Sequence, residues 1–234
     1  MRITRNFRAV VFDLDDTLYP EKDYVLSGFR AVANWMDTHY GISAKATYLE
    51  LKQIFENKSR SNTFDLWLIQ HQLSVDKLVR HLVQVYREHL PTIQPFGEVP
   101  ALLSTLKAKY RLALLSDGYL NVQRKKLSAL GIASFFKTVI FSDEWGREYW
   151  KPNSRIFEIT LEKLGVKGGE TLYVADNPNK DFHGARMAEM QTIRLRLPSG
   201  LYSMDNPQDA SYAPDLEVTS HQELSQLLLH RSNP

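Results

Sequence analysis

The stretch Phe12-Asp13-Leu14-Asp15-Asp16-Thr17-Leu18 directly follows the apolar run at 9–11. Three carboxylates within four residues repel one another, and an ordinary turn uses only one or two acidic residues. If residues 9–12 form a β-strand, Asp13 and Asp15 project to the same side because side chains alternate along a strand. The pair then predicts a divalent cation such as Mg²⁺, which prefers oxygen ligands. A turn or helix cap built by the same residues is the alternative.

Short β-rich runs alternate with segments of helical pattern along the chain. The runs are 9–12, 112–115, 138–141, 171–174 and 192–195, and the expected helices are 98–109, 122–130, 155–164 and 181–189. This alternation predicts an α/β fold with a doubly wound, Rossmann-like parallel sheet. Gly131 and Gly165 stand where helices commonly end. An irregular loop after Leu197 and a last helix at 221–230 complete the expected core.

Roughly 75 residues without a clear strand separate the first two runs, which is far more than an ordinary crossover needs. Their apolar residues recur at helical spacing, as in Val25, Phe29, Val32 and Met36, and again in Leu78, Leu82, Val85 and Tyr86. Two further helices are expected at 45–57 and 64–72. The sequence therefore predicts an all-α helical bundle at 20–92, inserted into a core of residues 1–19 and 93–234. The aromatic residues at these spacings are expected in the bundle core rather than in a ligand site.

Two further motifs contain polar residues that could belong to the same site. The second strand ends in Ser116-Asp117-Gly118, where a hydroxyl and free backbone N–H groups are suited to phosphate oxygens, although these residues also form common turns. Lys151 stands directly before Pro152, which restricts it to extended geometry and so fixes the direction of its side chain. A fixed ammonium pairs with both carboxylate and phosphate, and an exposed loop lysine is the alternative.

The fourth motif, DNPNKD at 176–181, follows the strand at 171–174. The carboxyl ends of parallel strands meet at one edge of the sheet, so Asp176 and Asp181 are expected at the same edge as Asp13 and Asp15. Ligands of open α/β sheets bind at this edge. Independent structural reasons for polar residues at each strand end are a weaker explanation than one shared site. The four motifs together predict a site for a metal and a phosphate.

Composition limits the partners of the chain. The 234 residues carry 29 Lys+Arg and 27 Asp+Glu, a formal net charge of +2, so a nucleic-acid partner is not expected. The chain has no cysteine, which excludes disulfides, thiolate zinc sites and a cysteine nucleophile. The basic N-terminal residues lead into an apolar run too short for a signal segment or a membrane span. We therefore expect a cytoplasmic protein, monomeric or homodimeric, without a membrane partner.

In their order, the segments DLDDTL at 13–18, SDG at 116–118, KP at 151–152 and DNPNKD at 176–181 resemble the haloacid dehalogenase (HAD) superfamily of phosphohydrolases. The resemblance extends over nearly the whole chain. The helical insert looks like the cap of family members such as phosphoglycolate phosphatases and β-phosphoglucomutases, which closes over small substrates and excludes water. One departure is Ala175, where many relatives carry glycine.

The resemblance implies a role for each motif residue. Asp13 would be the nucleophile that forms an aspartyl-phosphate, and Asp15 would protonate the leaving oxygen and then activate water. Mg²⁺ would be held by the Asp13 carboxylate, the Asp15 backbone carbonyl and Asp176, with Asp181 binding directly or through another ligand. Ser116 and the amides of Asp117 and Gly118 would bind the phosphoryl group, and Lys151 would neutralise its charge. Asp16 is expected to be a turn or capping residue.

The expected activity is a Mg²⁺-dependent phosphatase for a small phosphorylated metabolite such as a sugar phosphate, a nucleotide or phosphoglycolate. A phosphomutase of the same superfamily is the nearest alternative. A phosphoaspartate receiver is disfavoured by the long insert, and a regulatory protein without turnover is the remaining option. Residues of either of two groups could face the leaving group or could be structural: Arg60, Asn62, Trp67 and His71 in the insert, and Trp145, Arg147, Tyr149 and Trp150 before Lys151.

Overall fold

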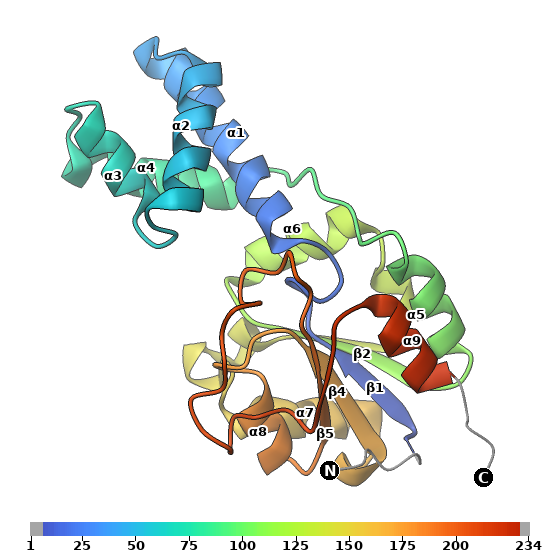
Figure 1. The fold of residues 1–234 in the computed structure, drawn as a ribbon. Helices are drawn as coiled ribbons and strands as arrows, with labels where there is room; N and C mark the ends of the chain where they lie inside the picture. The colour runs from blue at the N-terminus through green and yellow to red at the C-terminus, as the bar shows by residue number, and fades with distance from the viewer. Residues whose placement is uncertain (1–6, 230–234) are drawn as a thin grey trace. The chain divides into compact units, whose positions relative to one another are not determined.

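The core of the protein is a six-stranded parallel sheet (Figure 1). The structure is a computed structural model that describes residues 7–229, so His230 and the basic residues before Phe7 lie outside the described part. The strand order is β3-β2-β1-β4-β5-β6, and every neighbouring pair is parallel. The strands are β1 (Ala9–Phe12), β2 (Arg111–Ser116), β3 (Thr138–Phe141), β4 (Thr171–Ala175), β5 (Gln191–Leu195) and β6 (Leu216–Val218). The predicted α/β fold is confirmed.

Helices cover both faces of this sheet. On one face α7 (Ser154–Leu164) and α8 (Phe182–Met187) pack onto a buried core that includes Val11 and Ala175. Away from them, α5 (Val99–Lys107) and α9 (His221–Leu229) lie side by side (Figure 1). All four residues of β1 are fully buried because the strand has a neighbour on each side and is covered above and below. The site residues that follow β1 therefore begin from a rigid central strand.

The turns around the sheet largely match the sequence pattern. After β2 comes α6 (Leu120–Leu130), and both α6 and α7 end at a glycine with positive φ, +66° at Gly131 and +67° at Gly165. Four short 3₁₀ helices were not expected: η1 (Ala133–Phe135), η2 (Ser142–Trp145), η3 (Arg147–Tyr149) and η4 (Gly168–Glu170). Strand β6 was also not expected, since a run of three residues carries almost no alternation pattern.

The chain divides into two compact units, residues 1–21 with 94–234 and residues 22–93. The second unit consists of helices: α1 (Glu21–Tyr40), α2 (Ala44–Asn57), α3 (Thr63–Gln70) and α4 (Val75–Glu88). Its core contains most of the residues that the helical spacing indicated, and Phe29 packs edge-on against Phe55 and Phe64. Leu78 and Leu82 are buried, whereas Val85 and Tyr86 are only partly buried. This unit is an all-α bundle, and its role as a cap remains a prediction.

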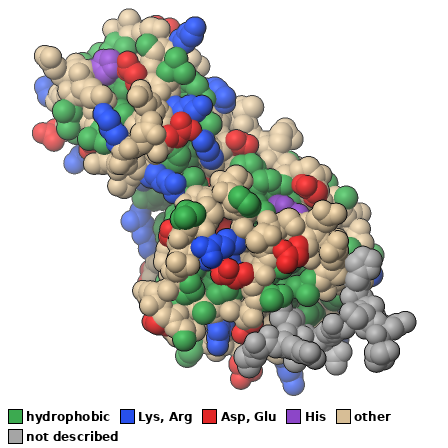
Figure 2. All heavy atoms as spheres, in the orientation of Figure 1, with side chains coloured by type: hydrophobic (Ala, Val, Ile, Leu, Met, Phe, Trp, Pro, Cys, Tyr) green, Lys and Arg blue, Asp and Glu red, His purple; other side chains and the backbone are tan. Residues whose placement is uncertain are grey.

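The surface does not show a large area of one charge on the face in view. Acidic and basic side chains are interspersed there (Figure 2). Within the described residues, no helix is both long enough and apolar enough to cross a membrane.

Candidate active site

The four motifs meet at the carboxyl edge of the sheet. Asp13 directly follows β1 and Asp176 follows β4, the strand beside it, while Ser116 is the last residue of β2 on the other side. The amide of Asp13 continues the ladder by donating to the Val174 carbonyl, at 2.9 Å. Because these strands are parallel neighbours, their ends present the motif residues to one another.

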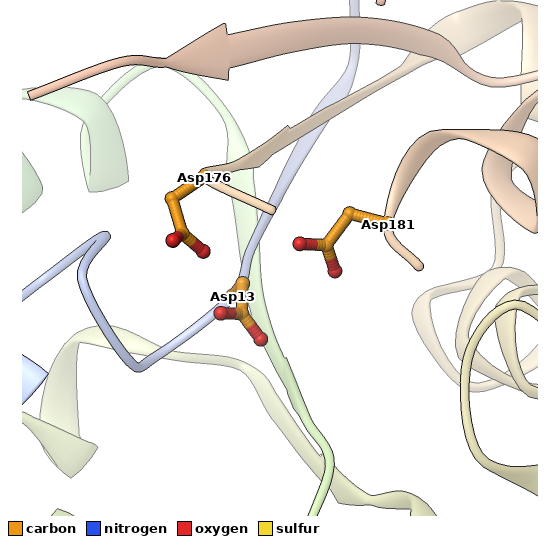
Figure 3. Close-up of side chains that lie close together, drawn as sticks. All are labelled: Asp13, Asp176 and Asp181. Carbon is orange, nitrogen blue, oxygen red and sulfur yellow. The ribbon is translucent and has the colours of Figure 1, made fainter. Parts of the chain in front are cut away.

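Three buried carboxylates form the centre of the site. Asp13, Asp176 and Asp181 each offer an oxygen that lies within 4.8 Å of the others, and Figure 3 shows the three side chains around a common space. Oδ2 of Asp13 is buried and has no hydrogen-bond partner among residues 7–229. Leaving a buried acceptor unpaired is costly. An oxygen-rich cluster with an unpaired acceptor fits a hard cation such as Mg²⁺.

Lys151 neutralises part of this charge from within the protein. Its fully buried Nζ donates to Oδ1 of Asp13 at 2.6 Å and to the Tyr173 hydroxyl at 3.0 Å, and it lies 2.7 Å from Oδ1 of Asp181. Burial opposes the charged form, yet Asp13 and Asp181 raise the pKa of Lys151 well above its usual value. The predicted fixed ammonium is therefore present, and the exposed-loop alternative is wrong for Lys151.

The three carboxyl groups do not ionise alike. Burial raises the pKa of Asp13 to about 6 despite the opposing effect of Lys151. Burial, followed by repulsion from Asp181 and Asp13, raises the pKa of Asp176 well above its usual value. Burial acts in the same direction on Asp181, but Lys151 and Lys180 outweigh it and lower that pKa. Ionising all three carboxyl groups together is therefore unfavourable unless a further positive charge is present, and a bound cation would supply it.

Asp15 lies beside this cluster but is not part of it. Its Oδ1 accepts hydrogen bonds from the Tyr19 hydroxyl and from Nζ of Lys126, the latter at 2.7 Å. Burial opposes ionisation, but Lys126 and Tyr19 lower the pKa of Asp15. Its carboxylate is therefore ionised at neutral pH. The metal ligand expected from Asp15 is its backbone carbonyl, and that remains a prediction.

The Ser116-Asp117-Gly118 segment is held by side chains as well as by β2. The buried Ser116 hydroxyl donates to Oε1 of Gln123 at 3.2 Å. The Asp117 carboxylate accepts from the Ser142 hydroxyl at 2.6 Å and from the amide of Lys151 at 3.0 Å, so this side chain ties the second motif to the third. Gly118 has φ +120°, and a Cβ there would lie 2.5 Å from Nε2 of Gln123. Only glycine suits this position.

Comparison with known proteins identifies the family. The family model described as haloacid dehalogenase-like hydrolase matches residues 10–195, most of the chain. The chain belongs to this family. The protein is 32% identical over 225 residues to a glyceraldehyde 3-phosphate phosphatase of Methanopyrus kandleri, covering 93% of this chain and 95% of that one. It is 31% identical over 237 residues to the human N-acylneuraminate-9-phosphatase, covering 94% of this chain and 93% of that one.

The fold of a solved HAD protein agrees with this assignment. Bacillus subtilis YfnB, solved bound to magnesium, superposes with a TM-score of 0.69 at 22% identity, covering 96% of this chain and 100% of that one. The family and the curated relatives together make this HAD protein a phosphatase, a phosphoric monoester hydrolase that acts on a phosphorylated metabolite.

Several residues around the HAD site were not singled out from the sequence. Lys126 and Gln123 contact Asp15, and Arg194 donates from Nε to the backbone carbonyl of Asp176 at 2.9 Å. Arg194 is fully buried and also donates to the Tyr202 carbonyl at 2.8 Å. A charged residue in the middle of a buried strand was the available signal for Arg194, since arginine is seldom fully buried without partners.

The remaining sequence expectations have mixed outcomes. Asp16 is a capping residue, as expected, because its Oδ1 accepts from the amide of Glu21, the first residue of α1, at 2.8 Å. Trp67 is fully buried and donates to Glu50 at 2.8 Å, which is a structural role. Arg147 is exposed and lies over the Tyr119 ring, 4.8 Å from its centroid. A substrate contact by any of the residues considered for the leaving group stays a prediction.

Proposed function

We propose that this HAD phosphatase is Mg²⁺-dependent and works through an aspartyl-phosphate on Asp13. One observation carries the proposal. One carboxylate oxygen of Asp13 is held by Lys151, and the other is buried without a partner in the described part of the chain, next to the carboxylates of Asp176 and Asp181. One oxygen of such a carboxylate is suited to bind a metal. The other lies beside a positive charge, and this oxygen can receive a phosphoryl group.

Three oxygen donors of the chain are suited to bind Mg²⁺. Asp13 and Asp176 would bind through carboxylates and Asp15 through its backbone carbonyl. Both oxygens of Asp181 already accept hydrogen bonds, Oδ1 from Tyr173 at 3.0 Å and Oδ2 from the Asn177 amide at 3.0 Å. Asp181 would therefore support the metal site through neighbouring groups rather than as a direct ligand. When bound, the cation would offset the charge on the transferring phosphoryl group.

The chain's own residues then divide the work of two half-reactions. Lys151, Ser116 and the amides at 117 and 118 hold the phosphoryl oxygens while Asp13 attacks phosphorus. The incoming phosphate dianion raises the pKa of the nearby Asp15, so this carboxylate can take up a proton and pass it to the leaving oxygen. In the second half-reaction, ionised Asp15 accepts a proton from the water that attacks the aspartyl-phosphate.

The substrate class follows from the chemistry that the relatives' names share. Glyceraldehyde 3-phosphate and N-acylneuraminate 9-phosphate, named for the curated relatives, both carry phosphate on a terminal primary alcohol of a small polar molecule. We infer a substrate of the same kind, with the bundle at 22–93 serving as the cap that excludes water. A panel of sugar phosphates, nucleotides and 2-phosphoglycolate identifies it.

The decisive experiment replaces Asp13. We expect Asp13→Asn to lower turnover of 4-nitrophenyl phosphate by at least about 10³-fold, because an amide is not a nucleophile. Asp37→Asn, the same change at an exposed position of α1, should leave turnover unchanged. Chelation of metal should abolish wild-type turnover, and added Mg²⁺ should restore it. Retained activity in Asp13→Asn would refute the mechanism, and a sugar phosphate converted without release of free phosphate would indicate a phosphomutase.

A further inference from the structure

Helix α6 places two polar residues where a helix normally places apolar ones. Gln123 and Lys126 are each only 3% exposed, and they lie one turn apart on the same face of the helix. Arg124, between them, is exposed. Lysine and glutamine are rarely buried this completely without a specific partner. Both residues have hydrogen-bond partners in the active site.

The two residues act on different oxygens of Asp15. Nζ of Lys126 donates to Oδ1 at 2.7 Å, and the Tyr19 hydroxyl donates to the same oxygen. Within the described part of the chain, Oδ2 receives only a long contact of 3.5 Å from Nε2 of Gln123. Gln123 in turn accepts from the Ser116 hydroxyl at 3.2 Å. One oxygen of Asp15 is therefore firmly held, and the other is left for a further partner.

We propose that Lys126 and Tyr19 are positioning residues that hold Oδ1 of Asp15, so that Oδ2 is the atom that exchanges the proton with substrate. This inference rests on the proposed function. As the P–O bond breaks, its electron pair passes to the ester oxygen. That oxygen takes the proton from Oδ2 and leaves as an alcohol. In the second half-reaction Oδ2 takes a proton from water as the water oxygen bonds to phosphorus and Asp13 is released.

This role predicts a dependence on the leaving group. Phenolate needs a proton more than 4-nitrophenolate does, because it is the stronger base. A misdirected Asp15 therefore penalises phenyl phosphate more, although the two substrates have nearly the same size. General acid catalysis contributes about 10²- to 10⁴-fold. We expect Lys126→Met to lower kcat/KM for phenyl phosphate about tenfold further than for 4-nitrophenyl phosphate. Tyr19→Phe, which removes only a hydroxyl, should act in the same direction with a smaller effect.

Two controls separate positioning from general damage. Lys125→Met makes the same change at the adjacent, partly buried position of α6 and should leave the ratio of the two kcat/KM values unchanged. Lys126→Arg keeps a donor and should recover part of the ratio. Circular dichroism and thermal midpoints report whether each variant folds. If Lys126→Met does not fold, Tyr19→Phe carries the test, because its change is isosteric.

A double-mutant cycle completes the design. If Lys126 acts through Asp15, Lys126→Met should have little further effect on phenyl phosphate turnover in an Asp15→Asn background. The inference is overturned if the effects of Lys126→Met and Asp15→Asn on turnover multiply in the double variant. It is also overturned if Lys126→Met alone lowers kcat/KM equally for both substrates. The proposed function is tested separately: an inactive Asp13→Asn with an equal loss in Lys126→Met overturns only the positioning role, whereas an active Asp13→Asn overturns the mechanism itself.

Discussion

At the scale of single residues, Asp13 is where proton and metal compete. Burial raises its pKa from 3.8 to about 6, with Lys151 opposing. A protonated carboxyl group must lose its proton before it binds a cation. We predict that the Mg²⁺ dissociation constant, measured by isothermal titration calorimetry, rises by up to about tenfold per pH unit as the pH falls below about 6. A constant affinity between pH 5 and 7 would contradict this assignment.

The same raised pKa sets the sign of a stability effect in metal-free protein. Because the folded state holds the Asp13 proton more tightly than the unfolded chain does, this group's stabilising contribution is complete below pH 3.8. It is lost as the pH rises through about 6. Burial and the neighbouring Asp181 and Asp13 push Asp176 in the same direction. Mg²⁺ bound at the proposed site would reverse this balance at neutral pH, because it would replace the protons on these carboxylates.

Residue by residue, the sequence located the groups at strand ends and missed those on helix faces. Asp13, Ser116 and Asp176 were found because each lies at the carboxyl end of a buried strand, which places it at the sheet edge. Lys151 was found because Pro152 follows it directly. Lys126 was missed because residues 124–126 read Arg-Lys-Lys, which is typical of a solvated helix surface. Which of these side chains faces inward depends on the rotation of α6, and tertiary packing fixes that rotation.

At the scale of elements, the close approach of α8 to the third motif holds Asp181 near Lys151. A Cβ at Gly184 would lie 2.3 Å from the Pro152 carbonyl and 2.7 Å from the Phe157 ring. We predict that Gly184→Ala destabilises the protein by about 1–3 kcal/mol in urea unfolding and lowers Mg²⁺-dependent turnover. Gly169→Ala is the matched control, because its Cβ would meet nothing within 4 Å. Equal stability of the two variants would mean that α8 can shift without cost.

Element prediction succeeded where burial pattern and length were both informative. The five predicted strands are largely buried runs of four to six residues that recur between helices, and all five are present within a residue or two of the expected bounds. The α5 helix is shorter than expected, Val99–Lys107 rather than 98–109. The α8 helix also covers only Phe182–Met187 of the expected 181–189. Strand β6 exists because β5 offers an open edge for pairing, and that cause is not local to residues 216–218.

At the scale of the whole molecule, the two compact units each have a core of their own, and the proposed metal site belongs to one of them. Binding to the folded state alone stabilises it by about 2.7 kcal/mol when the ligand is at 100 times its dissociation constant. Some core amides in the unit of residues 1–21 and 94–234 exchange their hydrogen only when the whole unit unfolds. Mg²⁺ should therefore slow the hydrogen exchange of these amides by about 100-fold.

Hydrogen exchange followed by mass spectrometry measures both units at once. Peptides covering β1 and β4 should gain protection with Mg²⁺, whereas peptides from the α1–α4 bundle should change little if that unit opens on its own. Asp13→Asn should remove most of the gain, because it replaces a proposed ligand without altering either fold. Equal protection in both units would show that they unfold as one cooperative body, and no protection in either would leave the acidic cluster without its proposed cation.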